Sequence, residues 1–418
     1  MKSTARIPSL TCAALAFGLV AFVSPSSPAA TFRVIQTFNC TANSGCGPSG
    51  PLALDQSGNL YGSALGGGPQ DYGVVFELSP NPDGTWSETI LHTFDFEKDG
   101  AGPSFGVTFD GAGNLYGTTS QTGGPQDLGT VYELTPQGGG WTISLLNNYA
   151  ADSNLLPDQS GNVYGSIGLG DYEGGAVSEL SPGPDGWTDT AIYSFCSMRP
   201  QCPDGLLPSL LVFDARGNLY GTTLYGGNKL PYCSADPQGC GVAFELTSNR
   251  DGTWTYHLIH AFAAFANDAQ LADGALLVDR NDGLYGTAPL GGPNYDSGMV
   301  FKFTPSTVGT AWKESAVYTF PDCSQGCGPY YGVVMDKAGN LYGVAGGGAP
   351  ACGGGACGIV YELSPQQNGK WKYTKLHEFS GPDGMFPNAV TVGPDGNIYG
   401  TTQAGGKYNL GVAFEITP

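Results

Sequence analysis

The chain has 418 residues, of which 67 are glycine and 30 are proline, and only 12% are charged. This composition excludes a protein built of long amphipathic helices and favours many short strands between Gly and Pro turns. The net charge of −20 argues against nucleic acid and against anionic membrane surfaces as partners, and favours neutral partners or cations.

Residues 1–30 have the features of a secretory signal peptide. Lys2 and Arg6 form a basic start, residues 10–23 are apolar, and residues 27–30 offer small side chains for cleavage. Loss of these two positive charges would change the net charge from −20 to −22. The apolar stretch is short for a membrane span, and neither a second span nor a C-terminal anchor follows it. We therefore predict a secreted or cell-surface protein with no membrane span in the mature chain.

One motif organises the rest of the chain, and its first copy is the Asp-x-x-Gly-Asn-Leu-Tyr-Gly sequence at residues 55–62. Near-copies follow at intervals of 48 to 65 residues. A period of this size in a Gly-rich, strand-forming chain is typical of a propeller or another repeat array. The repeated tyrosines are Tyr61, Tyr116, Tyr164, Tyr220, Tyr285, Tyr342 and Tyr399.

Each repeat contains four strand-like segments, which we call A, B, C and D. In the first repeat they are residues 52–55, 59–63, 73–78 and 86–94. Asp55 and Gly58 are suited to a tight A–B hairpin, because Asp bonds to its own turn and Gly accepts positive φ. Val74, Phe76 and Leu78 alternate with other residues, which is the period of a strand.

The two ends of the chain are offset by one strand. Residues 32–38 match a D strand, whereas the last repeat stops after its C strand at residues 411–416. In a ring, the N-terminal strand would complete the last blade and remove an exposed sheet edge. We therefore predict an all-β fold, a single seven-bladed β-propeller over residues 31–418. Its blades are four-stranded and antiparallel, and residues 32–38 join the C-terminal blade at 388–416.

The cysteines indicate local disulfides. Cys12 lies in the signal peptide, and the other ten fall in close pairs in the B–C and D–A links, which emerge on one face of a propeller. An even count at short spacing in an exported chain favours disulfides over zinc. The predicted pairs are Cys40–Cys46, Cys196–Cys202, Cys233–Cys240, Cys323–Cys327 and Cys352–Cys357.

The fullest copies of the repeat, at residues 110–134 and 214–246, read Asp-x-x-Gly-Asn-Leu-Tyr-Gly-Thr-Thr, then Gly-Gly, then a strand ending in Glu-Leu. This pattern resembles the GloVer-type tandem repeat of exported bacterial proteins, over nearly the whole mature chain. The resemblance implies a propeller-like repeat protein with no assigned activity. Ser178 and Lys302 depart from the pattern, where other copies have an aromatic residue and Glu.

Most residues with chemical potential recur in several copies, which favours structural roles. The repeated Glu of strand C is expected to accept hydrogen bonds within its blade. His92, His260 and His377 share one D-strand position and are expected to be half-buried there. Asp-Gly steps at Asp99, Asp204, Asp273 and Asp383 precede strand A, and Ca²⁺ binding there is a weaker alternative to turn chemistry.

The B–C loops place tyrosine, aspartate and asparagine together, which suits a sugar, since rings stack on its apolar face and polar groups bond its hydroxyls. We expect a monomer that binds an extracellular glycan or protein through the loop face, or that serves in the envelope or matrix. The alternative is a polysaccharide-active glycoside hydrolase or lyase with its site on that face. No catalytic residue is assigned, and no cofactor is expected. The candidate ligand-binding residues are Asp71, Tyr72, Asp127, Asp171, Tyr172, Tyr225, Tyr295, Asp296 and Tyr408.

Overall fold

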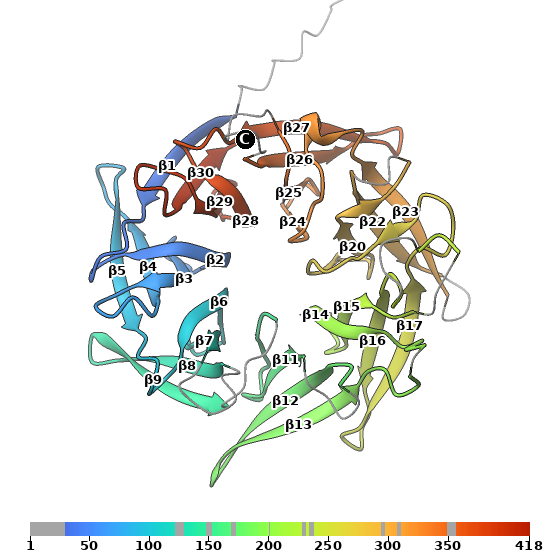
Figure 1. Ribbon diagram of the computed structural model, residues 1–418, viewed down its shortest axis with the longest axis horizontal. Coiled ribbons are helices and arrows are strands. Elements are labelled where there is room, and N and C mark those ends of the chain that lie inside the picture. The colour runs from blue at the N-terminus through green and yellow to red at the C-terminus, as the bar shows by residue number, and fades with distance from the viewer. Residues whose placement is uncertain are drawn as a thin grey trace, which may run out of the picture.

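The computed structural model is a ring of seven four-stranded antiparallel sheets around a central axis, as the sequence predicts (Figure 1). It describes residues 30–121, 129–147, 153–168, 173–199, 201–227, 231–233, 238–293, 297–306, 311–348 and 357–418. Nearly all of the predicted signal peptide lies outside these ranges. Within them, no helix is long and apolar enough to cross a membrane.

The strands follow one another from the axis outward in every blade. Blade 1 holds β2 (Gly45–Leu54), β3 (Leu60–Gly67), β4 (Val74–Pro80) and β5 (Trp86–Thr93). Blade 2 holds β6 (Ala101–Phe109), β7 (Leu115–Gln121), β8 (Thr130–Gln137) and β9 (Gly140–Asn147). Blade 3 holds β10 (Leu156–Pro157), β11 (Val163–Ile167), β12 (Ala176–Gly183) and β13 (Gly186–Ser194). Blade 4 holds β14 (Leu206–Phe213), β15 (Leu219–Tyr225), β16 (Val242–Ser248) and β17 (Trp254–Ala261).

The second half of the ring repeats this order. Blade 5 holds β19 (Leu277–Val278), β20 (Leu284–Ala288), β22 (Met299–Pro305) and β23 (Trp312–Thr319), with β18 (Ala269–Gln270) and β21 (Leu290–Gly291) paired beside it. Blade 6 holds β24 (Val333–Met335), β25 (Leu341–Ala345), β26 (Ile359–Pro365) and β27 (Trp371–Glu378), preceded by the 3₁₀ turn η1 (Cys323–Gln325). Blade 7 holds β28 (Met385–Val392), β29 (Ile398–Ala404), β30 (Val412–Thr417) and β1 (Thr31–Thr37).

The N-terminal strand closes the ring. β1 pairs antiparallel with β30, with Thr31 opposite Thr417 and Thr37 opposite Val412. Phe32 stacks on His377 of blade 6, with ring centroids 3.6 Å apart. The predicted offset between the chain ends is therefore confirmed as the closure of blade 7.

The repeated glycine of Leu-Tyr-Gly is explained by an aromatic ring of the neighbouring C strand. A Cβ on Gly62 would lie 2.7 Å from the ring of Phe76, and one on Gly400 would lie 2.5 Å from the ring of Phe414. Real side chains do not approach this closely, so the motif needs glycine wherever strand C carries an aromatic residue. In blade 3, Ser178 takes the place of that ring opposite Gly165.

The aspartate of the motif holds the A–B hairpin. Oδ1 of Asp55 accepts from the backbone N–H groups of Ser57 and Asn59, at 2.8 and 2.9 Å. Oδ2 accepts from the Asn59 amide at 2.9 Å and from the Tyr61 hydroxyl at 3.2 Å. The residues Asp, Asn and Tyr of the motif are thus one hydrogen-bonded unit that fixes the turn.

The innermost strand of blade 1 begins earlier than predicted. β2 starts at Gly45 rather than near Leu52, and its register against β3 shifts between Ser49 and Ala53. The stretch before Leu52 contains three glycines and two prolines, a composition that predicts a loop. The bulge lets these residues pair with β3, so that β2 extends toward the face of the D–A and B–C loops.

Candidate functional site

The three D-strand histidines form clamps to the start of the next blade. Nε2 of His92 lies 2.9 Å from Oδ2 of Asp99, and Nε2 of His377 lies 3.0 Å from Oδ2 of Asp383. The same aspartates accept backbone N–H bonds, Asp99 from Asp95 and Asp383 from Ser380. The predicted half-buried, structural placement of these histidines is confirmed, whereas His257 is exposed.

The grouping of Asp273 with the other Asp-Gly steps is wrong. In blade 5 the clamp is made by Asp268, whose Oδ2 lies 3.0 Å from Nε2 of His260 and accepts from the Ala264 N–H at 2.7 Å. Asp268 is followed by alanine, so the Asp-Gly pattern misses it. Asp273 does not make this clamp, and it lines the cavity at the centre of the ring instead.

A cavity of about 760 Å³ lies where the innermost strands meet, and residues of all seven blades line it. Its walls are largely apolar, and among the described lining residues Asp273 carries the single charge. Oδ1 of Asp273 is buried and has no hydrogen-bond partner in the described part of the chain. This burial raises the pKa of Asp273 to about 6. The polar lining residues are Asn154, Ser209, Asp273, Tyr330, Tyr331, Asn388, Thr391 and Gln403.

Hydrogen bonds between neighbouring blades fix the wall of this cavity. The Asn388 amide donates to the carbonyl of Pro48 at 2.8 Å, and the Ser49 hydroxyl donates to the carbonyl of Pro103 at 2.9 Å. The Ser209 hydroxyl donates to the backbone carbonyl of Asp273 itself. The backbone of Asp273 is therefore tied into the ring while Oδ1 of its carboxylate has no donor in the described part of the chain.

Exposed aromatic side chains lie around the cavity. The exposed fraction is 51% for Tyr330, 38% for Tyr331, 37% for Phe105 and 54% for Phe386. The Tyr331 hydroxyl donates to Oδ1 of Asn388 at 3.3 Å, which ties one of these rings to the polar wall. The cavity thus combines flat apolar rings with a few convergent polar groups, which is the usual make-up of a small-molecule site.

Phe386 holds a backbone conformation that favours glycine. Its φ is 57°, and its N–H donates to the carbonyl of Cys357 in the preceding blade at 2.9 Å. Gly47, Gly102 and Gly328 make the same inter-blade bond with φ of 59°, 62° and 56°. The left-handed conformation costs a non-glycine residue about 1 to 2 kcal/mol. Leu207 and Leu271 hold the equivalent position with φ of 57° and 55°, and of these three bulky residues Phe386 alone lines the cavity.

The structure describes four of the nine predicted loop residues. Tyr72 and Tyr408 are exposed, with fractions of 38% and 47%, and Tyr225 is half-buried at the end of β15. The backbone carbonyl of Tyr72 accepts from the Gly102 N–H at 2.9 Å, so this loop abuts the innermost strand of blade 2. The predicted residues Asp127, Asp171, Tyr172, Tyr295 and Asp296 lie outside the described residues.

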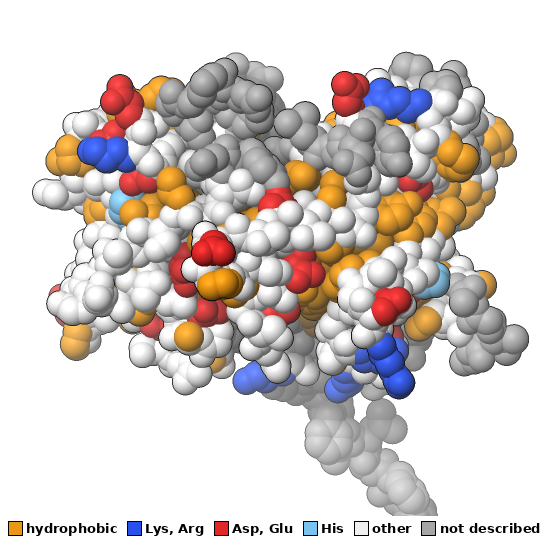
Figure 2. All heavy atoms as spheres, turned by 90° about the horizontal axis from the view of Figure 1, so that it is seen from below, with side chains coloured by type: hydrophobic (Ala, Val, Ile, Leu, Met, Phe, Trp, Pro, Cys, Tyr) orange, Lys and Arg blue, Asp and Glu red, His pale blue; other side chains and the backbone are white. Residues whose placement is uncertain are grey.

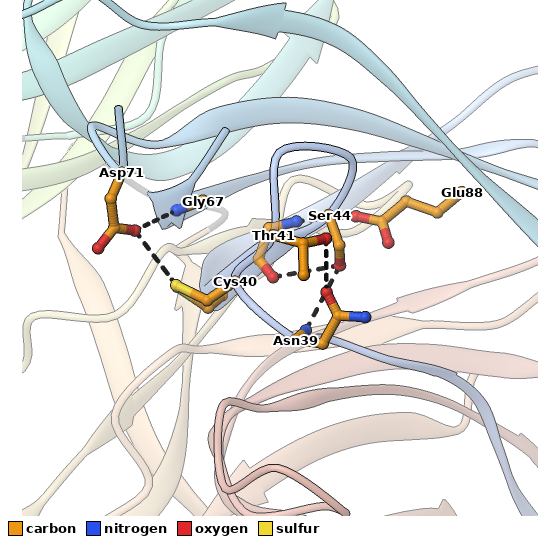
Figure 3. Close-up of a disulfide and its surroundings, with 9 residues drawn as sticks. Asn39, Cys40, Thr41, Ser44, Gly67, Asp71 and Glu88 are labelled. Carbon is orange, nitrogen blue, oxygen red and sulfur yellow. Dashed lines mark hydrogen bonds between the residues drawn. A yellow bond between two sulfur atoms is a disulfide. The ribbon is translucent and has the colours of Figure 1, made fainter. Parts of the chain in front are cut away.

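Asp71 has a local structural contact. Its Oδ1 accepts from the Gly67 N–H at 2.7 Å, beside the Cys40–Cys46 disulfide. Figure 3 shows Asp71 pointing toward Gly67 and the Cys40 sulfur, with Glu88 beside Ser44. Asp71 therefore braces its loop, and its outer oxygen alone is available to a ligand.

The predicted disulfide framework is present in the described residues. Four of the predicted pairs are bonded: Cys40–Cys46, Cys196–Cys202, Cys233–Cys240 and Cys323–Cys327. Cys357 is also in a disulfide, and its predicted partner Cys352 lies outside the described residues. These bonds brace D–A and B–C links, which is the face that carries the cavity rim.

The repeated glutamate of strand C serves its own blade. Oε1 of Glu133 accepts from the Tyr116 hydroxyl at 2.9 Å, and Oε1 of Glu245 accepts from the Tyr220 hydroxyl at 2.9 Å.

On the side of the ring shown in Figure 2, Lys and Arg appear as separate spots rather than as a continuous surface. This scattered distribution of positive charge differs from the continuous basic stripe of a nucleic-acid interface.

The ring of tandem repeats, with the cavity at its centre, defines a seven-bladed β-propeller. The chain belongs to the Gloeobacter/Verrucomicrobia repeat family, whose model matches residues 18–233, 144–348 and 232–418. The predicted resemblance to this repeat is therefore confirmed. A search of the curated proteins finds no match.

Solved structures match the chain at low sequence identity. One is provisionally assigned as an oxidoreductase (glucose dehydrogenase) from Thermus thermophilus, with 14% identity, a TM-score of 0.41, and coverage of 93% of this chain and 100% of that chain. Another is provisionally assigned as a 6-phosphogluconolactonase from Bacteroides uniformis, with 14% identity, a TM-score of 0.47, and coverage of 79% of this chain and 85% of that chain. At this distance neither carries an argument about activity.

Proposed function

We propose that this protein is an exported, non-catalytic propeller that binds an extracellular glycan at the mouth of its central cavity. The observation that carries the proposal is the ring of Phe386, held exposed at the cavity in a conformation that blades 1, 2 and 6 assign to glycine. Exposed rings of Phe105, Tyr330 and Tyr331 accompany it. Flat rings stack on the apolar faces of sugars, and amides bond the hydroxyls.

The charge in the cavity supports binding over hydrolysis. Glycoside hydrolases use two carboxyl groups about 5 to 9.5 Å apart. Asp273 is the single carboxylate among the described residues that line the cavity. Disulfide-bonded loops are typical of proteins that work in an oxidising compartment, which supports export. Tyr72, Tyr225 and Tyr408 extend the proposed surface along the B–C loops, with the other predicted loop residues as its further members.

The test is a glycan-array screen of the mature protein, with and without Ca²⁺, with release of reducing sugar measured on every hit. Binding without sugar release supports the proposal. Release of product would replace it by the polysaccharide-active enzyme, and binding to none of the glycans would overturn it in favour of a protein partner or an envelope role.

Phe386→Gly is the decisive variant, because it removes the ring and also relieves the left-handed backbone. We expect its thermal stability to equal or exceed that of the wild type while glycan affinity falls at least tenfold. Leu207→Gly is the matched control, since Leu207 has φ of 57° and the same inter-blade bond but does not line the cavity. Unchanged affinity in Phe386→Gly, or equal loss in both variants, would contradict the assignment.

A further inference from the structure

The outer strands of neighbouring blades meet through one repeated contact, which we call the outer-strand joint. In each joint, a residue near the start of one D strand faces a residue near the end of the preceding blade's D strand. Two joints are stacked tyrosines, with ring centroids 4.7 and 4.8 Å apart. Two others pair an amide with a carboxylate. The described joints are Gln36–Glu88, Asn147–Asp189, Tyr193–Tyr256, His260–Glu314, Tyr318–Tyr373 and His377–Phe32.

The joint between blades 4 and 5 differs, because it gathers three ionisable side chains. Nε2 of His260 lies 2.9 Å from Oε2 of Glu314 and 3.0 Å from Oδ2 of Asp268. The side chains of Asp268 and Glu314 are 0% and 4% exposed, and that of His260 is 16% exposed. The cluster is therefore buried, with a narrow approach from solvent at the imidazole.

The hydrogen bonds of this cluster do not balance. Nε2 of His260 can carry one proton and faces both carboxylates, while Asp268 also accepts from the N–H groups of Ala264 and Ala269. Oε2 of Glu314 is buried without a hydrogen-bond partner in the described part of the chain. A buried carboxylate without a donor costs several kcal/mol unless it is protonated or meets a cation.

The spacing of the donor atoms fits a metal ion. One oxygen of each carboxylate and Nε2 of His260 all lie within 4.8 Å of one another. Octahedral bonds of about 2.1 Å place neighbouring donors about 3.0 Å apart, close to the 2.9 and 3.0 Å found here. An imidazole nitrogen with two carboxylates suits Mn²⁺ or Zn²⁺, whereas Ca²⁺ and Mg²⁺ take oxygen ligands.

We propose that His260, Asp268 and Glu314 form a structural site for a divalent transition-metal ion that clamps blade 4 to blade 5. The ion replaces the Nε2 proton, gives Glu314 a partner, and leaves its remaining coordination positions to water from the exposed side of the imidazole. The joint of His377 lacks the glutamate and the joint of Glu88 lacks the histidine and the aspartate, so among the described joints the three donors meet between blades 4 and 5 alone. It is independent of glycan binding at the central cavity.

The experiment uses the full mature protein after treatment with a chelator and dialysis. Co²⁺ is added as the spectroscopic probe, and Mn²⁺, Zn²⁺, Ca²⁺ and Mg²⁺ are compared by calorimetric titration and thermal unfolding. We expect stoichiometric binding of one Co²⁺ with a ligand-field spectrum, and a rise of several degrees in Tm with Mn²⁺ or Zn²⁺ that Ca²⁺ and Mg²⁺ do not give.

Glu314→Gln preserves the shape of the joint and removes one ligand, so it should lose the Co²⁺ spectrum and weaken binding at least tenfold. Glu88→Gln and His377→Gln, in joints that have a glutamate or a histidine–aspartate pair alone, should bind Co²⁺ as the wild type does. If Glu314→Gln fails to fold, the wild type and these two controls still decide the matter. Absence of a Co²⁺ spectrum in the wild type, equal binding in Glu314→Gln, or equal loss in the controls would overturn the proposal.

Discussion

In blade 5, Nζ of Lys302 donates to Oδ2 of Asp279 at 2.9 Å and takes over a bond that asparagine makes in other hairpins. The asparagine position holds Gly283, and a Cβ there would lie 2.7 Å from Cε of Lys302. Nζ also donates to the Tyr285 hydroxyl at 2.8 Å. The two departures from the repeat, lysine for glutamate and glycine for asparagine, therefore compensate for each other. Lysine occupies the space of the missing asparagine side chain and makes its hydrogen bond.

This exchange predicts strong coupling between positions 283 and 302. Lys302→Glu alone should lower the free energy of unfolding by about 2 to 3 kcal/mol. The change removes the donor to Oδ2 of Asp279 and places a second carboxylate beside it. Adding Gly283→Asn should restore most of that loss, since the amide then donates as Asn59 does in blade 1. Urea unfolding of both single variants and the double variant measures the coupling. Additive losses would show that the two positions are independent.

The serine of blade 3 leaves the place of an aromatic ring unfilled. Ser178 lines a small cavity together with Gly165 and Leu180, and its hydroxyl is buried without a hydrogen-bond partner in the described residues. We expect Ser178→Phe to raise the free energy of unfolding by about 1 kcal/mol, because the ring fills this space as Phe76 does above Gly62. Ser178→Ala is the control for removal of the hydroxyl alone. A loss of stability in Ser178→Phe would mean that the neighbouring side chains pack against serine and leave no room for the ring.

Asp273 should make the stability of the ring depend on pH. Burial raises its pKa in the folded state to about 6, above the value of about 3.9 in the unfolded chain. The folded state therefore holds the proton more tightly. The contribution of Asp273 to stability is greatest below pH 4, falls as the pH rises toward 6, and stays low above it.

Asp273→Asn removes this titration. At pH 7.5 the variant should be more stable than the wild type by about 2 to 3 kcal/mol, with the difference becoming small near pH 4. Urea unfolding across this pH range measures it, and Asp185→Asn on an exposed turn serves as the control. A difference that is constant with pH would contradict a buried, titrating carboxyl at position 273.

The sequence predicts the ring better than it predicts the cavity. Repetition fixes the blades, since each copy carries the same hairpin and the same Gly under an aromatic ring. The charge in the cavity comes from one position of the innermost strand, which is Ser209 in blade 4, Asp273 in blade 5 and Asn388 in blade 7. A residue that varies among the copies has a weak repeat signal. Alignment of the copies on the proline that precedes Ser49, Ser104, Ser209 and Asn388 would have indicated it.

The left-handed position of Phe386 and the joint of His260 were missed for a related reason. Three of the equivalents of Phe386 are glycines, so the pattern predicts a turn and hides an exposed ring. Glu314 lies 54 residues from His260 in the chain, and only the packing of blade against blade brings them together. Contacts between blades follow from the curvature of the ring, which the sequence of one repeat does not encode.

Closure of the ring should depend on Phe32. Its ring contacts His377, Phe379 and Phe414, so it joins blade 7 to blade 6 as well as to β30. We expect Phe32→Ala to lower the free energy of unfolding by about 2 to 3 kcal/mol through loss of apolar burial and ring contacts. Val34→Ala on the exposed side of β1 is the control and should change stability by less than about 0.5 kcal/mol.

Deletion of residues 31–38 extends this test, because it leaves β30 as an unpaired edge. Thermal unfolding should show a larger loss of stability than Phe32→Ala, together with self-association through the open strand. A deletion variant with wild-type stability would contradict closure by the N-terminal strand.

The pairing of Thr31 with Thr417 gives the fold a strict order in time. The strand that emerges early from the ribosome has its partner in β30, after six other blades in the chain, so those blades can form before the seventh is complete. Until then both rims of the gap stay open, and the chain has a horseshoe shape rather than a channel. The cavity and its aromatic rim, which need blade 7 and Phe386, can therefore form only after the strands of blade 7 have been made.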